Sequence, residues 1–140
     1  MISFKSAIAA AVLSAAAFAA NADVVVVMSA KSPVTALTKD QVSDIFLGKA
    51  STFPQGGQAV PIDLAAGAPN RDEFYTKVTG RTAVQLKSYW AKQSFSGKGT
   101  APKAVAGDDE VKKLIAANPN TIGYIDKSRL DATVKAVFAP

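Results

Sequence analysis

A continuous run of β-branched residues, DVVVVMSA at positions 23–30, restricts the folds open to this chain more than any other feature. A half-buried strand alternates apolar and polar side chains, whereas a strand that is apolar at every position is buried on both faces. Such a strand lies inside a sheet and not at its edge. The run therefore predicts a central strand.

The segment before this run, residues 1–22, predicts a cleaved secretory signal peptide. It has Lys5 near its start, an apolar stretch from Ala7 to Ala20, and the small-x-small cleavage site Ala20-Asn21-Ala22. The stretch is shorter than the roughly 20 residues of a membrane span and consists mostly of alanine. We therefore expect a single domain at residues 23–140, exported to the periplasm and not inserted in the membrane.

Two residue types that carry much of enzyme chemistry are missing from the sequence. The chain has neither cysteine nor histidine, which excludes disulfides, thiolate or histidine metal sites, and Ser-His or Cys-His catalytic pairs. The carboxylates show no metal-ligand or acid/base spacing. The net charge is +5, but the lysines are scattered and not gathered on one element, as nucleic-acid binding requires. The sequence thus predicts a protein that is not an enzyme, with no catalytic residues, no metal, no cofactor and no nucleic-acid partner.

Two capping boxes predict helix starts. In LTKDQVSDIFLGK, Thr38 and Gln41 satisfy the first N–H groups of a helix that ends at Gly48. In RTAVQLKSYWAK, Thr82 and Gln85 do the same for a helix over the rest of that segment. The apolar side of this second helix is expected to consist of Val84, Leu86, Tyr89 and Trp90.

The remaining pattern predicts strands at residues 59–65, 121–126 and 133–139 and a helix at residues 69–78. A further helix is capped by Asp108 and ends at Asn118-Pro119. The stretch SFSGKGTAPKAVAG, between the helix that begins at Thr82 and the helix capped by Asp108, is expected to be a loop. This mixture of strands and crossover helices predicts an α/β layered domain.

The segment DLAAGAPNRDEFYTK contains the candidate site, because it runs from a strand through a glycine turn into a helix. Such a turn directs backbone N–H groups and the positive end of the helix dipole at one point, which suits an anion. Two interpretations stay open. Asn70 and Arg71 supply extra donors to an anion, or the segment is an ordinary turn in which Arg71 faces solvent or pairs with Asp72 or Glu73. The candidate anion-binding residues in this segment are Gly67, Ala68, Asn70 and Arg71.

Two more candidates lie elsewhere in the chain. Ser29 ends the first strand, at a carboxyl end where open α/β sheets bind ligands. Lys98 lies between glycines in the SGKG loop, which is either a site rim or a plain surface loop. The aromatic residues are expected in or beside the core, and not in a stacking platform for a sugar or base. These aromatic residues are Tyr75, Tyr89, Trp90, Phe95 and Tyr124.

Several motifs resemble one known family. DIFLGK at Asp44–Lys49 and NPNTIGYI at Asn118–Ile125, with VPIDLAAGAPNRDEFY and SYW between them, are similar to the C-terminal part of the phosphate-binding protein of bacterial phosphate ABC transporters. That protein belongs to the type II periplasmic binding proteins. The resemblance implies an α/β fold: a single three-layer lobe with a mixed sheet flanked by helices. It also implies membership of a recognisable subgroup of small exported proteins that consist of this lobe alone.

The resemblance implies a substrate-binding protein for phosphate or a similar oxyanion, in transport or sensing with a membrane transporter or sensor protein. Two departures leave an alternative open. The family's first lobe has no counterpart here, and alanine occupies both hydroxyl positions of the family's anion turn, at Ala66 and Ala68. The alternative is a protein-interaction or assembly domain that keeps the fold without the ligand. A homodimer, or a partner that supplies the second lobe, would rebuild a cleft.

Overall fold

The computed structural model describes residues 23–140, so the signal peptide predicted at residues 1–22 lies outside the described residues. In chain order the elements are β1 (Val24–Ser29), α1 (Lys39–Phe46), β2 (Val60–Leu64), α2 (Pro69–Thr79), α3 (Ala83–Phe95), β3 (Lys103–Val105), α4 (Asp108–Ala117), β4 (Thr121–Asp126), the short 3₁₀ helix η1 (Lys127–Arg129) and β5 (Val134–Phe138).

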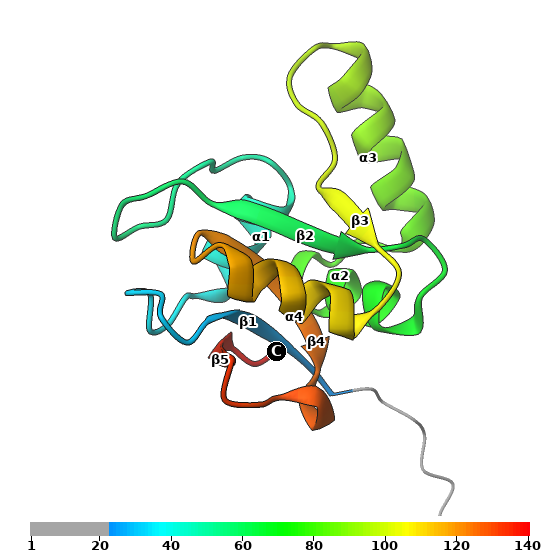
Figure 1. The fold of residues 1–140 in the computed structure, drawn as a ribbon. Helices are drawn as coiled ribbons and strands as arrows, with labels where there is room; N and C mark the ends of the chain where they lie inside the picture. The colour runs from blue at the N-terminus through cyan, green and yellow to red at the C-terminus, as the bar shows by residue number, and fades with distance from the viewer. Residues whose placement is uncertain (1–22) are drawn as a thin grey trace, which may run out of the picture.

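The strands form one mixed sheet in the order β3-β2-β4-β1-β5 (Figure 1). β2 runs parallel to β3 and β4, whereas β1 runs antiparallel to β4 and β5. β1 lies inside this sheet, and each of its residues is buried. The prediction of a central strand from the valine run is confirmed.

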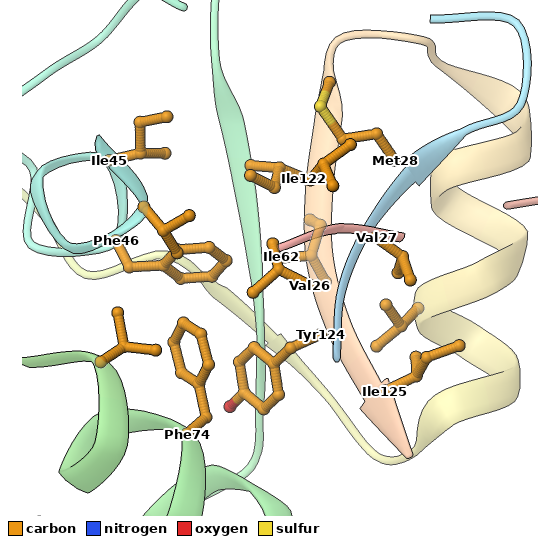
Figure 2. Packing of buried hydrophobic residues seen from close by; sticks show 14 of the residues in the cluster. Val26, Val27, Met28, Ile45, Phe46, Ile62, Phe74, Ile122, Tyr124 and Ile125 are labelled. Atoms are coloured by element: carbon orange, nitrogen blue, oxygen red, sulfur yellow. The ribbon is translucent and has the colours of Figure 1, made fainter. Parts of the chain in front are cut away.

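Helices cover both faces of the sheet. Figure 2 shows α1 and α2 on one side of β4 and β1, and α4 on the other. On the first side Phe46 and Phe74 pack on Tyr124, and the rings of Phe74 and Tyr124 are stacked with centroids 4.0 Å apart. On the second side α4 lies so close to Gly123 that a Cβ there would be 2.6 Å from Cγ1 of Val111. The predicted three-layer α/β architecture is confirmed.

The helix starts follow the local sequence. Thr38 and Thr82 both accept the N–H of the residue three positions later, and both capping boxes are complete. Gly48 has φ +73°, the left-handed conformation that ends a helix and that glycine adopts without strain. Within residues 23–140 no helix is long and apolar enough to cross a membrane.

Four sequence predictions are wrong in detail. Lys103–Val105, expected in a loop, forms the edge strand β3 paired with β2, and three residues are too few to show a periodicity. α3 continues to Phe95, past the expected end near Lys92. Val84 and Phe95 are 76% and 97% exposed instead of buried. Asp108 does not cap α4: Gly107 occupies the N-cap position, and the carboxylate of Asp108 accepts the backbone N–H of Asp126 at 3.1 Å.

Candidate functional site

The candidate turn lies where β2 and β3 end side by side. The N–H of Ala65 donates to the carbonyl of Val105 at 3.0 Å, and Gly67 has φ +91°, which favours glycine. The N–H of Ala68 closes the turn on Ala65 at 3.2 Å. Among residues 23–140, no hydrogen-bond acceptor is paired with the N–H of Gly67 or of Asn70. The turn therefore offers free backbone donors at Gly67 and Asn70.

The starts of two helices face one depression of about 670 Å³ at this end of the sheet. The start of α2 contributes Ala68 and Asn70, and the start of α4 contributes Gly107 and the residues after it. The positive ends of two helices therefore converge there with the free N–H of Asn70, whereas Gly67 lies outside the lining of the depression. The lining residues are Leu64, Ala68, Pro69, Asn70, Ala106, Gly107, Asp108, Asp109, Glu110 and Arg129.

The helices around this depression differ from the others in how they begin. α1 and α3 have complete capping boxes, whereas neither Ala68 of α2 nor Gly107 of α4 makes a side-chain cap. The missing caps leave first-turn N–H groups available to a bound group. Both uncapped starts line the same depression.

Charges at the depression have mixed signs. Arg129 pairs with Asp109, and this hydrogen bond raises the pKa of the guanidinium. Asp109 also lies 4.0 Å from Lys112. Asp108 is engaged by the backbone of Asp126, and in the described part of the chain Glu110 is the lining carboxylate for which no ion pair or hydrogen bond is seen. Any anion in the depression would therefore lie near carboxylates as well as N–H donors.

Beneath the turn lies a buried polar cluster around Asp63. Its carboxylate accepts hydrogen bonds from the hydroxyls of Tyr124 and Tyr75, the latter at 2.7 Å, and from the N–H of Leu64 at 2.8 Å. Nε of Arg71 lies 3.6 Å from the same carboxylate, and its guanidinium is 5.4 Å from the ring centroid of Tyr75. Burial, followed by the charge of Asp63, raises the pKa of both tyrosines well above the usual value.

This cluster corrects the expectation for Arg71. Its side chain is directed at Asp63, and not at Asp72, at Glu73 or at solvent. Glu73 pairs with Lys77 instead, at 2.6 Å. Sequence reasoning missed the cluster, although one signal was present: a carboxylate inside an apolar strand needs a partner when it is buried.

The other predicted residues are distributed over the molecule. Gly67, Ala68 and Asn70 lie together at the turn. Ser29 lies at the opposite end of the sheet, because β1 runs antiparallel to β4 while β2 runs parallel to it, and its hydroxyl accepts the N–H of Lys31. Lys98 lies in the loop beyond α3 and does not line the depression. The structure thus brings together only the part of the predicted site that is contiguous in sequence.

No family model matches this sequence. Solved structures do match. A protein described as a phosphate ABC transporter substrate-binding protein with bound phosphate, from Clostridium perfringens, matches 82% of this chain with 27% identity and a TM-score of 0.66. An ABC-type phosphate transport receptor from Vibrio cholerae matches 82% with 19% identity and a TM-score of 0.64. PstS from Borrelia burgdorferi matches 75% with 14% identity and a TM-score of 0.57.

These matches show that the chain has the fold of one part of phosphate ABC transporter substrate-binding proteins. The chain spans 44%, 45% and 40% of the length of the three proteins, so it corresponds to less than half of each. The resemblance seen in the sequence motifs is confirmed, as is the single-lobe mixed-sheet fold that it implied. The first two are described as a substrate-binding protein and a transport receptor for phosphate.

Proposed function

We propose that this chain is an exported, non-enzymatic solute-binding module that holds phosphate or a similar oxyanion at the starts of α2 and α4. The observation that carries the proposal is the pair of uncapped helix N-termini at one depression, whereas α1 and α3 are capped. Support also comes from the Clostridium perfringens protein, whose structure contains phosphate. On the α2 side the donor is the N–H of Asn70, which lines the depression.

The mixed charge at the depression favours phosphate over sulfate. Near neutral pH phosphate carries a proton that it can donate to a carboxylate such as Glu110, whereas sulfate has none. A carboxylate beside sulfate only repels it. The depression is open to water, where charged contacts contribute little. We therefore expect binding in the millimolar range, about −4 kcal/mol.

The biological setting belongs to the same proposal. The signal peptide expected at residues 1–22 would deliver the domain to the periplasm, where it would present the oxyanion to a membrane transporter or sensor. A second lobe supplied by another chain would enclose the anion and strengthen binding, because each charged contact gains when water is excluded.

The experiment is an amide NMR titration of the purified protein with sodium phosphate and then sodium sulfate at low salt. We expect saturable shifts of the Gly67, Asn70 and Glu110 amides with phosphate, and weaker ones with sulfate. Asn70→Asp places a negative charge in the turn and should weaken binding about tenfold or more. This variant keeps the helix intact, because a carboxylate is favourable in a first helical turn.

The matched control is Asn120→Asp, which adds the same charge at the exposed start of β4, at the opposite end of the sheet. Phosphate binding by this variant should be unchanged, apart from the weaker long-range attraction that follows from its lower net charge. Arg71→Glu is unsuitable, because it would place a second carboxylate beside buried Asp63. Absence of shifts at millimolar phosphate, or equal weakening by both asparagine variants, would overturn the proposal.

The second candidate function is protein interaction without a ligand. Two observations favour it: Ala66 and Ala68 provide no hydroxyl in the turn, and the charge of Arg71 is offset by Asp63. A titration without phosphate shifts, in a protein that remains folded, would leave this candidate as the better one.

A further inference from the structure

α3 stands apart from the rest of the molecule. Figure 1 shows it projecting from the sheet, with its C-terminal end and the following loop farthest out. Only Leu86 and Trp90 of its thirteen residues are buried. Tyr89 makes one hydrogen bond to the rest of the molecule, since its hydroxyl donates to the carbonyl of Leu47 at 2.6 Å. One face of α3 is thus anchored, and the opposite face is free in the described structure.

The free face carries a row of residues with coiled-coil spacing, here named the α3 stripe: Val84, Ser88, Ala91 and Phe95. At about 100° per residue, these four lie within about 60° of one another around the helix. All four are exposed, Val84 by 76% and Phe95 by 97%. Large apolar side chains at both ends and small ones in the middle give a shape into which another helix fits closely.

A groove adjoins the outer end of the stripe. It has a volume of about 710 Å³ and is formed by the last turn of α3 and the returning loop. Ala91 and Phe95 contribute its apolar wall, and Lys92 and Lys98 contribute positive charge. An apolar side chain flanked by carboxylates would suit this groove.

Charge around the stripe has one sign. Residues 74–107 contain six basic residues and no carboxylate. Lys87 and Lys92 lie about 70° to either side of the stripe, at the positions that flank a coiled-coil seam. A second copy packed on α3 would bring these lysines against each other, so the charge disfavours self-association. The six basic residues are Lys77, Arg81, Lys87, Lys92, Lys98 and Lys103.

We propose that the α3 stripe docks an acidic amphipathic helix of a partner protein, with apolar residues on the stripe and carboxylates beside Lys87 and Lys92. An anionic bilayer is a poorer fit, because Val84 and Phe95 are about 16 Å apart along the helix with only small residues between them. They present no continuous apolar face for membrane insertion. The proposal does not depend on anion binding at the depression.

The probe is a synthetic three-heptad helix with leucine at positions a and d and glutamate at e and g, labelled with a fluorophore. Its binding to the purified protein is measured by fluorescence anisotropy. A second peptide with lysine in place of glutamate tests charge, and vesicles containing phosphatidylglycerol test the membrane. Sedimentation tests self-association.

We expect the acidic peptide to bind and the basic peptide and vesicles not to bind. Phe95→Ser should weaken binding about tenfold or more, and so should the double change Lys87→Glu with Lys92→Glu. Lys113→Glu, an exposed lysine on α4, is the matched control and should have little effect. Phe95 is almost fully exposed, so Phe95→Ser should leave the melting temperature unchanged.

Two results of the binding assay would overturn the proposal. The first is that the acidic peptide does not bind, whether or not the vesicles bind. The second is that the peptide binds the Phe95→Ser variant with the same affinity as the unchanged protein. Amide shifts confined to Val84–Lys98 on peptide addition would place the contact on the stripe. Shifts confined to the depression would instead contradict it.

Discussion

We expect a single substitution at Asp63 to lower the free energy of unfolding more than one at any other position considered below. The residue is buried, and its carboxylate accepts three hydrogen bonds, from Tyr75, Tyr124 and the backbone of Leu64, while Nε of Arg71 lies 3.6 Å away. Asp63→Asn keeps the shape but removes the charge. The amide oxygen of the asparagine can accept only some of these three hydrogen bonds, and the amide NH₂ group then faces another hydrogen-bond donor.

The magnitude follows from this geometry. The Arg71 and Asp63 side chains are only 16% and 5% exposed, so solvent screens the pair little. Removing one partner of a buried ion pair costs about 3–5 kcal/mol. Tyr75→Phe removes one donor and leaves the charges paired, so its cost should be smaller, about 1–3 kcal/mol. The control, Asp44→Asn on the exposed side of α1, should change stability by no more than about 0.5 kcal/mol.

Urea unfolding followed by the fluorescence of Trp90 measures these differences, because Trp90 is the single tryptophan and is buried. Far-UV circular dichroism provides a second probe of two-state unfolding. With a slope of about 1–3 kcal/mol/M, the midpoint for Asp63→Asn should fall by about 1 M or more. A loss below about 1 kcal/mol, or one no larger than that of Tyr75→Phe, would refute the assignment of Asp63 as the centre of the cluster.

Two further predictions concern the core. Because burial raises the pKa of Tyr75 and Tyr124, only the unfolded state loses their protons near pH 10. The free energy of unfolding should therefore decrease above that pH by up to about 1.4 kcal/mol per pH unit for each tyrosine. Tyr75→Phe should reduce this slope in unfolding curves at pH 9–11, and an unchanged slope would contradict the prediction. Gly123→Ala places a methyl 2.6 Å from Val111 Cγ1 and 3.3 Å from Ile115 Cδ1, so α4 must shift. Thermal melts should show a stability lower by about 1–3 kcal/mol. An unchanged melting temperature would show that α4 packs more loosely.

Much of the secondary structure could be predicted from short stretches of sequence. The boxes at Thr38 and Thr82 are complete within four residues, and Gly48 and Gly80 end their helices in the left-handed conformation. These features depend on contacts between near neighbours in the chain. The central position of β1 was also predictable, because burial on both faces leaves a continuous apolar pattern.

The candidate site was predictable only where it is local. Gly67 and Asn70 belong to one turn, so one segment was enough to find them. The start of α4 joins them because β3 pairs with β2, a contact between residues 62–64 and 103–105 that no short pattern reveals. Ser29 was misplaced for the same reason, since strand direction is decided by pairing and not by the strand's own residues.

The sequence by itself determined where most helices and strands begin and end, that the β1 run is central, and which reactive side chains are absent. Tertiary structure decided the orientation of side chains between elements. It turned Arg71 inward to Asp63, brought two uncapped helix starts to one depression, and left Val84 and Phe95 on the outside of α3. The physical reason is that capping and turns act within a few residues, whereas pairing of buried charges and burial of a helix face depend on what distant segments bring against them.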